Sequence, residues 1–208
     1  MRCCVPTWKR TSDPSRRLQP VRPGTCIAAA AAAVALGACT AGPRRSAPPA
    51  EAAAPARPVG CVDISALSPK NAPPEILPGV RQCLDAHDYA RAARLFAVSD
   101  AYGRFDTLRV RDVTAHEVIP ALDSAYLGSA DQDSKAQLLV TVKELSASSA
   151  DLLSLCRQVR ALGPPTYYPT YMTLHGLLSG QQAGLKRDFN RGAAWESALQ
   201  AVLQCPGR

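Results

Sequence analysis

From residue 61 onward, apolar side chains recur every three or four positions, which is the spacing of one face of an α-helix. The spacing is clearest over residues 76–87 and residues 138–159. No stretch alternates apolar and polar residues as a half-buried strand does. The pattern therefore predicts an all-α domain over residues 61–208, a compact bundle of about five to seven helices.

Caps and helix breakers set the expected bounds of the first two helices. Pro78-Gly79 is expected to delay the start of the first helix, and Asp88 to cap a second helix that ends near Gly103. The string from Asp88 to Phe96 resembles the second helix of a tetratricopeptide repeat. Because no second copy follows at a repeat length, the resemblance implies one helical hairpin and no solenoid.

The later helices are expected from similar signals. The string Thr114-Ala115-His116-Glu117 has the form of a capping box and predicts a helix that Pro120 kinks. The apolar seam over residues 138–159 predicts one long helix, bent near residues 146–149 and stopped by Gly163. The remaining expected elements are a short helix through Leu174, Leu177 and Leu178 and a last helix over residues 190–204.

Residues 40–60 have a different composition, dominated by Ala and Pro. The prolines are Pro43, Pro48, Pro49, Pro55 and Pro58. Such a segment cannot bury apolar surface, and its prolines favour extended polyproline geometry. We therefore expect residues 39–60 to form a linker in front of the helical domain, about 3.1 Å long per residue where it is extended.

The stretch from Cys26 to Cys39, CIAAAAAAVALGAC, is uncharged and rich in alanine, and it follows several cations. It is shorter than the roughly 20 apolar residues that a membrane-spanning helix needs. The alternative, a buried helix of a cytosolic domain, requires an amphipathic spacing that this run lacks. Its last four residues, Leu36-Gly37-Ala38-Cys39, resemble the lipobox of bacterial lipoproteins.

The lipobox resemblance implies where the protein is located. Residues 1–38 would be a signal peptide that is cleaved off, and Cys39 would be acylated and would anchor the chain to a membrane. The mature protein would then not span the membrane. Residue 40 is Thr and not Asp, which by the sorting rule of Gram-negative lipoproteins implies the periplasmic face of the outer membrane. The inner membrane remains the alternative.

The net charge of +7 is carried mainly by the N-terminal segments. The chain has 24 Lys and Arg and 17 Asp and Glu, and residues 1–60 contain nine of the basic residues but only Asp13 and Glu51 of the acidic ones. Residues 61–208 therefore carry 15 charges of each sign. A neutral domain lacks the basic surface that phosphate binding requires, so nucleic acid is not an expected partner.

Cysteine usage indicates an oxidising compartment. Of the eight cysteines, Cys61, Cys83, Cys156 and Cys205 belong to the helical domain. Four cysteines in an exported domain suggest two disulfides with three possible connectivities. We favour Cys61–Cys83 and Cys156–Cys205, because each pairs neighbours along the chain. There is no CxxC or Cys–His pair with zinc-ligand spacing, so we predict no metal and no cofactor.

The sequence contains no recognised catalytic motif. It lacks GxSxG, HExxH, a phosphate-cradling glycine loop and a calcium loop. The three histidines fall in separate helical contexts, so no catalytic residue is predicted. One charged cluster is expected to be a solvated surface, and it consists of Arg104, Asp106, Arg109, Arg111 and Asp112.

The clearest candidate surface follows the double proline at 164–165. It consists of Tyr167, Tyr168, Tyr171 and Met172, which are the candidates for binding a partner. These residues would form a rigid aromatic patch for a protein, or would instead cover the core where the chain reverses. We expect a split result, with Tyr171 buried and Tyr167 exposed.

These features together favour a membrane-anchored periplasmic lipoprotein that binds an unknown protein partner without catalysis, as an accessory of an envelope complex or as an immunity protein. The alternative is a cell-envelope enzyme that acts on cell wall or lipid through an unrecognised active site. A deep cleft that gathers Glu117, Glu144 or Glu196 with a histidine would favour the enzyme. A flat apolar patch would favour the binding module.

Overall fold

The computed structural model describes residues 57–178 and 183–207. The predicted signal peptide, Cys39 and most of the linker lie outside these residues. Within them the chain forms seven α-helices and two 3-10 helices, and the only strand-like pairing is an isolated bridge between Val110 and Leu185. The all-α prediction is confirmed. No helix in this part of the chain is long and apolar enough to cross a membrane.

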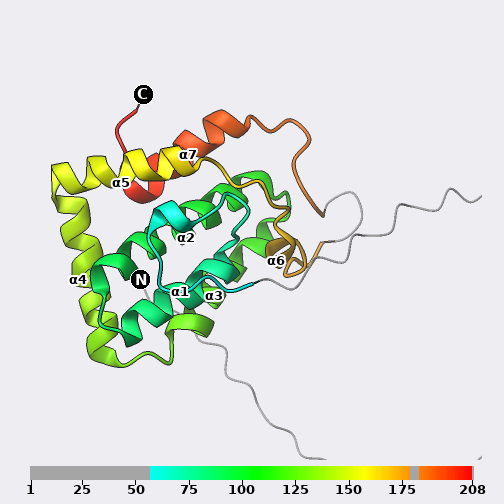
Figure 1. The fold of residues 1–208 in the computed structure, drawn as a ribbon. Coiled ribbons are helices and arrows are strands. Elements are labelled where there is room, and N and C mark those ends of the chain that lie inside the picture. Colours follow the sequence, from blue (N-terminus) through cyan, green and yellow to red (C-terminus); the bar gives the residue numbers. More distant parts are fainter. Residues whose placement is uncertain (1–56, 179–182, 208) are drawn as a thin grey trace, which may run out of the picture. The chain divides into compact units, whose positions relative to one another are not determined.

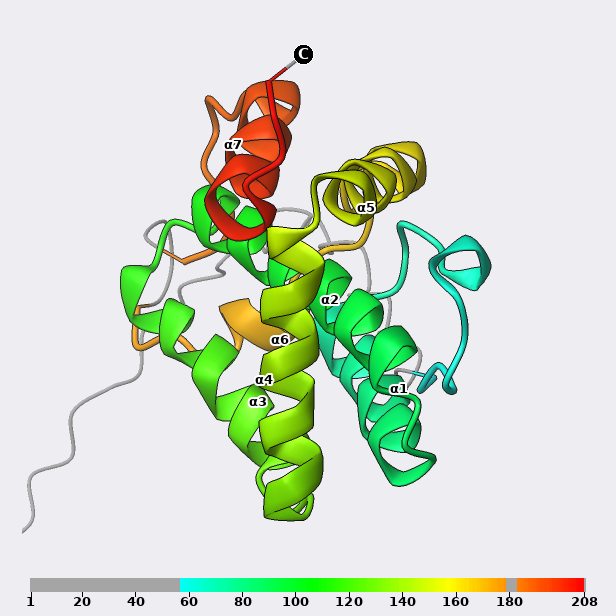
Figure 2. The same cartoon turned by 90° about the vertical axis from the view of Figure 1, so that its left-hand side faces the viewer.

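In chain order the elements are η1 (Ile64–Ala66), α1 (Pro73–Asp85), α2 (Tyr89–Arg109), η2 (Val113–Glu117), α3 (Val118–Leu127), α4 (Gln132–Ala147), α5 (Ser149–Leu162), α6 (Thr170–Thr173) and α7 (Arg191–Leu203). The long helix α2 packs against α1, α4 and α7, so it forms the centre of the bundle (Figure 1). Helix α5 contacts η1, α4 and α7, and α6 contacts η2 and α3. Figure 2 shows α4 lying across the bundle with α3 on one side and α1 and α2 on the other.

The core is built mainly from α1 and α2. Its largest fully buried side chains include Tyr102, Phe105, Ile76, Leu77, Leu84 and Leu95. Trp195 from α7 closes one side, with ring centroids 5.6 Å from Tyr102 and 6.0 Å from Phe105. The tilted and edge-to-face arrangement of these rings is the one that aromatic quadrupoles favour.

Two expected boundaries of α1 and α2 are wrong. Helix α1 begins at Pro73, because Pro73 and Pro74 occupy the first turn, where a missing backbone donor costs nothing. Pro78 lies inside the helix and does not delay its start. Asp88 caps α2 as predicted, accepting a hydrogen bond from the Arg91 backbone N–H over 3.1 Å. However, Gly103 does not end α2. It is buried inside the helix, where an added Cβ would lie 2.9 Å from Ile119 of α3.

The predicted capping box at Thr114 does not form. Residues 113–117 are the 3-10 helix η2, and Asp112 caps it by accepting hydrogen bonds from the Thr114 backbone N–H (2.9 Å) and hydroxyl (2.6 Å). Helix α3 begins only at Val118. Pro120 therefore lies in its first turn, where it removes no helical hydrogen bond.

The predicted long helix over residues 138–159 is two helices. Ser148 has an extended backbone (φ −82°, ψ 109°) and caps α5 through a hydrogen bond from the Asp151 backbone N–H to its hydroxyl (3.3 Å). Helices α4 and α5 consequently meet at a corner (Figure 1). The break lies within the stretch where a bend was expected, and Gly163 ends α5 as predicted, with a positive φ of 83°.

The last helix forms as predicted, whereas the predicted helix through Leu174, Leu177 and Leu178 does not. Helix α7 is capped by Asn190, whose side-chain oxygen accepts a hydrogen bond from the Ala193 backbone N–H (3.0 Å). By contrast, no helix runs through the three leucines that follow α6. Leu174 is 80% exposed and Leu177 84% exposed, so these side chains do not dock on the core.

Candidate functional site

Two of the three tyrosines that were predicted to bind a partner are hydrogen-bonded to a buried carboxylate on α2. The hydroxyls of Tyr167 and Tyr171 both donate hydrogen bonds to Oδ2 of Asp106, over 2.9 Å and 2.6 Å. Arg109 Nε donates to Oδ1 of the same carboxylate over 2.7 Å. Asp106 is fully buried and Arg109 nearly so. The expected solvated cluster is therefore, at these two residues, an internal ion pair.

The surroundings of this ion pair are aromatic. The Arg109 guanidinium carbon lies 5.1 Å from the centre of the Tyr167 ring and 5.2 Å from that of Phe105, within the range of a cation–π contact. Burial raises the pKa of the Asp106 carboxyl, whereas Arg109 and the two hydroxyl donors lower it. Burial, followed by the charge of Asp106, raises the pKa of both Tyr167 and Tyr171. Both hydroxyls consequently remain protonated donors at neutral pH.

These contacts correct the aromatic-patch prediction. Tyr167 was expected to be exposed, but it is half-buried and bound to Asp106. Tyr171 is half-buried through the same kind of bond. Met172 is fully buried and cannot contact a partner in this fold. Tyr168 alone among the four candidates is exposed, at 56%. Most of the segment thus covers the core where the chain reverses.

The residues named for an enzymatic site are not assembled into one. Glu117 and His175 line the same open, shallow hollow beside η2, but no hydrogen bond joins them. Glu196 accepts a hydrogen bond from Arg160 Nη2 over 2.9 Å, and this ion pair links α7 to α5. This open hollow brings Glu117 near His175, but it is not the deep cleft that was expected to favour an enzyme.

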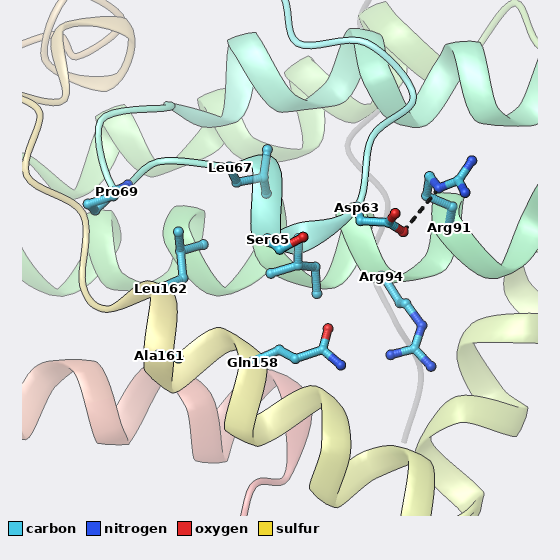
Figure 3. Close-up of a pocket in the computed structure, with 10 residues that line it drawn as sticks. Asp63, Ser65, Leu67, Pro69, Arg91, Arg94, Gln158, Ala161 and Leu162 are labelled. Carbon is cyan, nitrogen blue, oxygen red and sulfur yellow. Dashed lines mark hydrogen bonds and ion pairs between the residues drawn. The ribbon is translucent and has the colours of Figure 1, made fainter.

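A groove with a volume of about 770 Å³ lies between η1 and α5. One wall is residues 63–69, which include η1, and the opposite wall is formed by Gln158, Ala161 and Leu162 of α5. Arg91 and Arg94 of α2 line it between the two walls (Figure 3). We call this feature the η1–α5 groove.

A disulfide attaches each wall of the η1–α5 groove to another element. Cys61–Cys83, with a Cα–Cα distance of 5.0 Å, links the segment that leads into η1 to the core helix α1. Cys156–Cys205, with a Cα–Cα distance of 5.7 Å, links α5 to the end of α7. The predicted pairing is confirmed. Each bond therefore attaches one wall of the groove to another element of the bundle.

The two arginines of the groove have different surroundings. Arg91 forms ion pairs with Asp63 (3.2 Å) and Asp88 (2.6 Å). Arg94, one helical turn further along α2, is half-buried and has no hydrogen-bond or ion-pair partner among residues 57–178 and 183–207. Figure 3 shows Arg94 and Gln158 reaching toward each other from facing sides, with Pro69, Leu67 and Leu162 at the other end. The groove thus has a cationic end and an apolar end.

Sequence reasoning missed the groove residues. They come from three segments that are far apart in the chain, 63–69, 91–94 and 158–162. No single-segment pattern marks them, since Arg94 and Gln158 resemble ordinary surface residues of helices. The buried pair Asp106–Arg109 did leave a signal. Both residues continue the three- and four-residue spacing of Tyr102 and Phe105, which shows that the buried stripe runs past Gly103.

The described part of the chain contains no group of three or more His, Cys, Asp or Glu side chains arranged to hold a metal ion. Comparisons of the chain with protein-family models, with curated proteins and with solved structures found no match. The functional argument therefore rests on the residues and geometry of this chain.

Proposed function

We propose that this chain is a lipid-anchored lipoprotein of the bacterial cell envelope, on the periplasmic face of the outer membrane, whose helical domain binds a protein partner without catalysis. The binding site of this proposal is the η1–α5 groove, which would take an extended segment of the partner. The anchor would be Cys39, following the resemblance of residues 36–39 to a lipobox. The membrane is thus a partner through the lipid.

The observation that carries the binding proposal is the pair of disulfides that attach the groove walls to α1 and to the end of α7. A groove whose walls are fixed before binding loses less conformational entropy when a ligand enters. Its volume of about 770 Å³ lies within the range of pockets that hold small ligands or a few peptide residues. The disulfides also support an oxidising compartment such as the periplasm.

Site-specific photo-crosslinking in intact envelopes tests this proposal. A photoreactive residue replaces Ala161, which is exposed and lines the groove, and in a matched variant it replaces Ala150, which is exposed on the same helix outside the groove. We expect one adduct of defined mass at position 161 and none at position 150. The adduct should disappear with Ser65→Trp, because the indole would occupy the groove from an exposed position of the opposite wall.

Equal labelling at positions 161 and 150, or an adduct at 161 that survives Ser65→Trp, would contradict binding in the groove. Melting temperatures of both variants and of Ser65→Trp provide the control, since unfolding would also abolish an adduct. All of these positions are exposed, so we expect changes in stability of about 0.5 kcal/mol or less.

A further inference from the structure

We propose that the η1–α5 groove recognises a carboxylate on an extended apolar peptide, with Arg94 as the residue that binds the carboxylate. This inference rests on the function proposed above and names the chemistry of the ligand. The peptide would place its carboxylate at the α2 end of the groove and its apolar side chains at the end formed by Leu67, Pro69 and Leu162.

The argument begins with the charge at the α2 end. Arg91, Arg94 and Asp63 are the charged residues that line the groove, and the carboxylate of Asp63 is bound to Arg91. Asp88, the other partner of Arg91, does not line the groove and also accepts the backbone N–H of Arg91 as the cap of α2. Arg94 therefore contributes a positive charge to the groove that no lining carboxylate neutralises.

The position of Arg94 strengthens its attraction for an anion. Its side chain is half-buried, so the field of its charge is less screened than at a fully exposed site. A guanidinium presents several N–H donors in one plane, which match the two oxygens of a carboxylate. A carboxylate is thus the group that this side chain binds best among those that peptides carry.

Gln158 supplies a second donor on the facing wall. Its side-chain nitrogen donates a hydrogen bond to Ser154 Oγ over 3.2 Å, which uses one of the two amide protons. The second proton is available to an oxygen in the groove. Figure 3 shows this amide and the Arg94 guanidinium on facing sides of the same end. A carboxylate between them would accept hydrogen bonds from α2 and from the α5 wall.

The other end of the groove suits aliphatic side chains. Ile64 and Leu67 form the η1 side, and Leu162 forms the α5 side. A backbone hydrogen bond holds this end of the groove, because the carbonyl of Pro69 accepts from the Thr166 backbone N–H over 2.7 Å. This bond joins the η1 segment to the residues that follow α5. A ligand with an anionic end and an apolar body therefore matches both ends of the groove.

Three synthetic peptides test the inference with the full-length protein. The first is acetyl-Ala-Leu-Ala-Leu-Ala-Leu with a free C-terminal carboxylate, the second is the same peptide with a C-terminal amide, and the third is the amide with an internal Asp. Binding is measured by NMR titration, following the side-chain N–H signals of Arg94 and Gln158. The free-acid and Asp peptides distinguish a terminal carboxylate from a side-chain carboxylate.

We expect a carboxylate-bearing peptide to bind roughly tenfold more tightly than the plain amide, as one charge-assisted hydrogen bond provides. Arg94→Gln should abolish this preference. Arg104→Gln is the matched control, because Arg104 is an exposed arginine of the same helix outside the groove, and it should retain the preference.

Equal affinity for all three peptides, a preference that survives Arg94→Gln, or no binding of any of the three peptides would overturn the inference. The crosslinking experiment separates this failure from failure of the proposed function. An adduct at position 161 that persists in Arg94→Gln would leave binding in the groove intact and would reject the carboxylate-binding role of Arg94. Unchanged melting temperatures of Arg94→Gln and Arg104→Gln show that both variants fold.

Discussion

Replacing Tyr171 by Phe removes one oxygen atom, the hydroxyl that donates to Asp106 Oδ2 over 2.6 Å. Asp106 is fully buried, so water does not readily replace the lost donor. Hydrogen bonds to charged groups contribute about 1.5–3 kcal/mol. We therefore expect Tyr171→Phe to lower the free energy of unfolding by about 2 kcal/mol.

Urea denaturation under oxidising conditions, followed by circular dichroism at a helical wavelength, measures this change. Tyr168→Phe is the matched control, because Tyr168 is 56% exposed and belongs to the same segment. It should change stability by about 0.5 kcal/mol or less. The slope of the unfolding free energy against urea should stay the same in both variants, since neither alters the surface exposed on unfolding.

The double variant tests whether the two hydroxyls act through one acceptor. Tyr167→Phe removes the other donor to Oδ2, at 2.9 Å. Each single variant leaves one hydroxyl on Asp106, whereas Tyr167→Phe with Tyr171→Phe leaves none, so the double variant should lose more stability than the two single losses added together. A Tyr171→Phe protein as stable as the unsubstituted protein, or as stable as Tyr168→Phe, would refute this account of how the segment is held.

Three further predictions concern other parts of the chain. Cys39→Ala should abolish incorporation of labelled fatty acid in growing cells, and label retained in the variant would reject the lipobox assignment. Replacing Cys156 and Cys205 by Ser should lower the free energy of unfolding by up to about 4 kcal/mol, from loop-closure entropy over 49 residues, as urea denaturation would show. Burial raises the pKa of Asp100 and of Asp123, and the charge of Asp100 raises that of Asp123 further. Because the folded state then holds protons that the unfolded state releases, the free energy of unfolding should fall as pH rises above about 4. Asp123→Asn should reduce this fall, as urea denaturation between about pH 4 and 7 would show. An unchanged dependence of the unfolding free energy on pH in Asp123→Asn would contradict this prediction.

The fold could be predicted from sequence wherever local signals and burial agree. Asp88 and Asn190 cap their helices through short-range hydrogen bonds, and Gly163 ends α5 with a positive φ, so the chain itself specifies these boundaries. The prediction that Gly103 ends α2 was wrong because this glycine serves the packing of one helix against another. It allows Ile119 of α3 to approach α2, and only the packed structure contains that contact.

Charged residues were the main source of error at the candidate sites. Asp106 and Arg109 were expected at the surface, because isolated charges are costly to bury. Together with two tyrosine hydroxyls, however, they form a hydrogen-bonded cluster inside the bundle, in which only Arg109 Nη2 has no hydrogen-bond partner among the described residues. That compensation depends on residues about 60 positions away, and local spacing cannot show it. Arg94 could not be singled out from the sequence either. Nothing in its sequence neighbourhood distinguishes a half-buried arginine that has no carboxylate partner from an ordinary solvated one.

The placement of the disulfides indicates what they stabilise. A domain of roughly 150 residues buries enough surface to be stable without covalent links, and the core of α1 and α2 is already densely apolar. Each disulfide holds a wall of the groove on the bundle, since Cys61 precedes η1 and Cys156 lies on α5. The segment before η1 has no helical hydrogen bonds, and α5 buries only Leu155, Cys156 and Val159. Because these two elements are the walls of the η1–α5 groove, the disulfides hold each wall on the core of the bundle, as expected where a binding site must keep its shape.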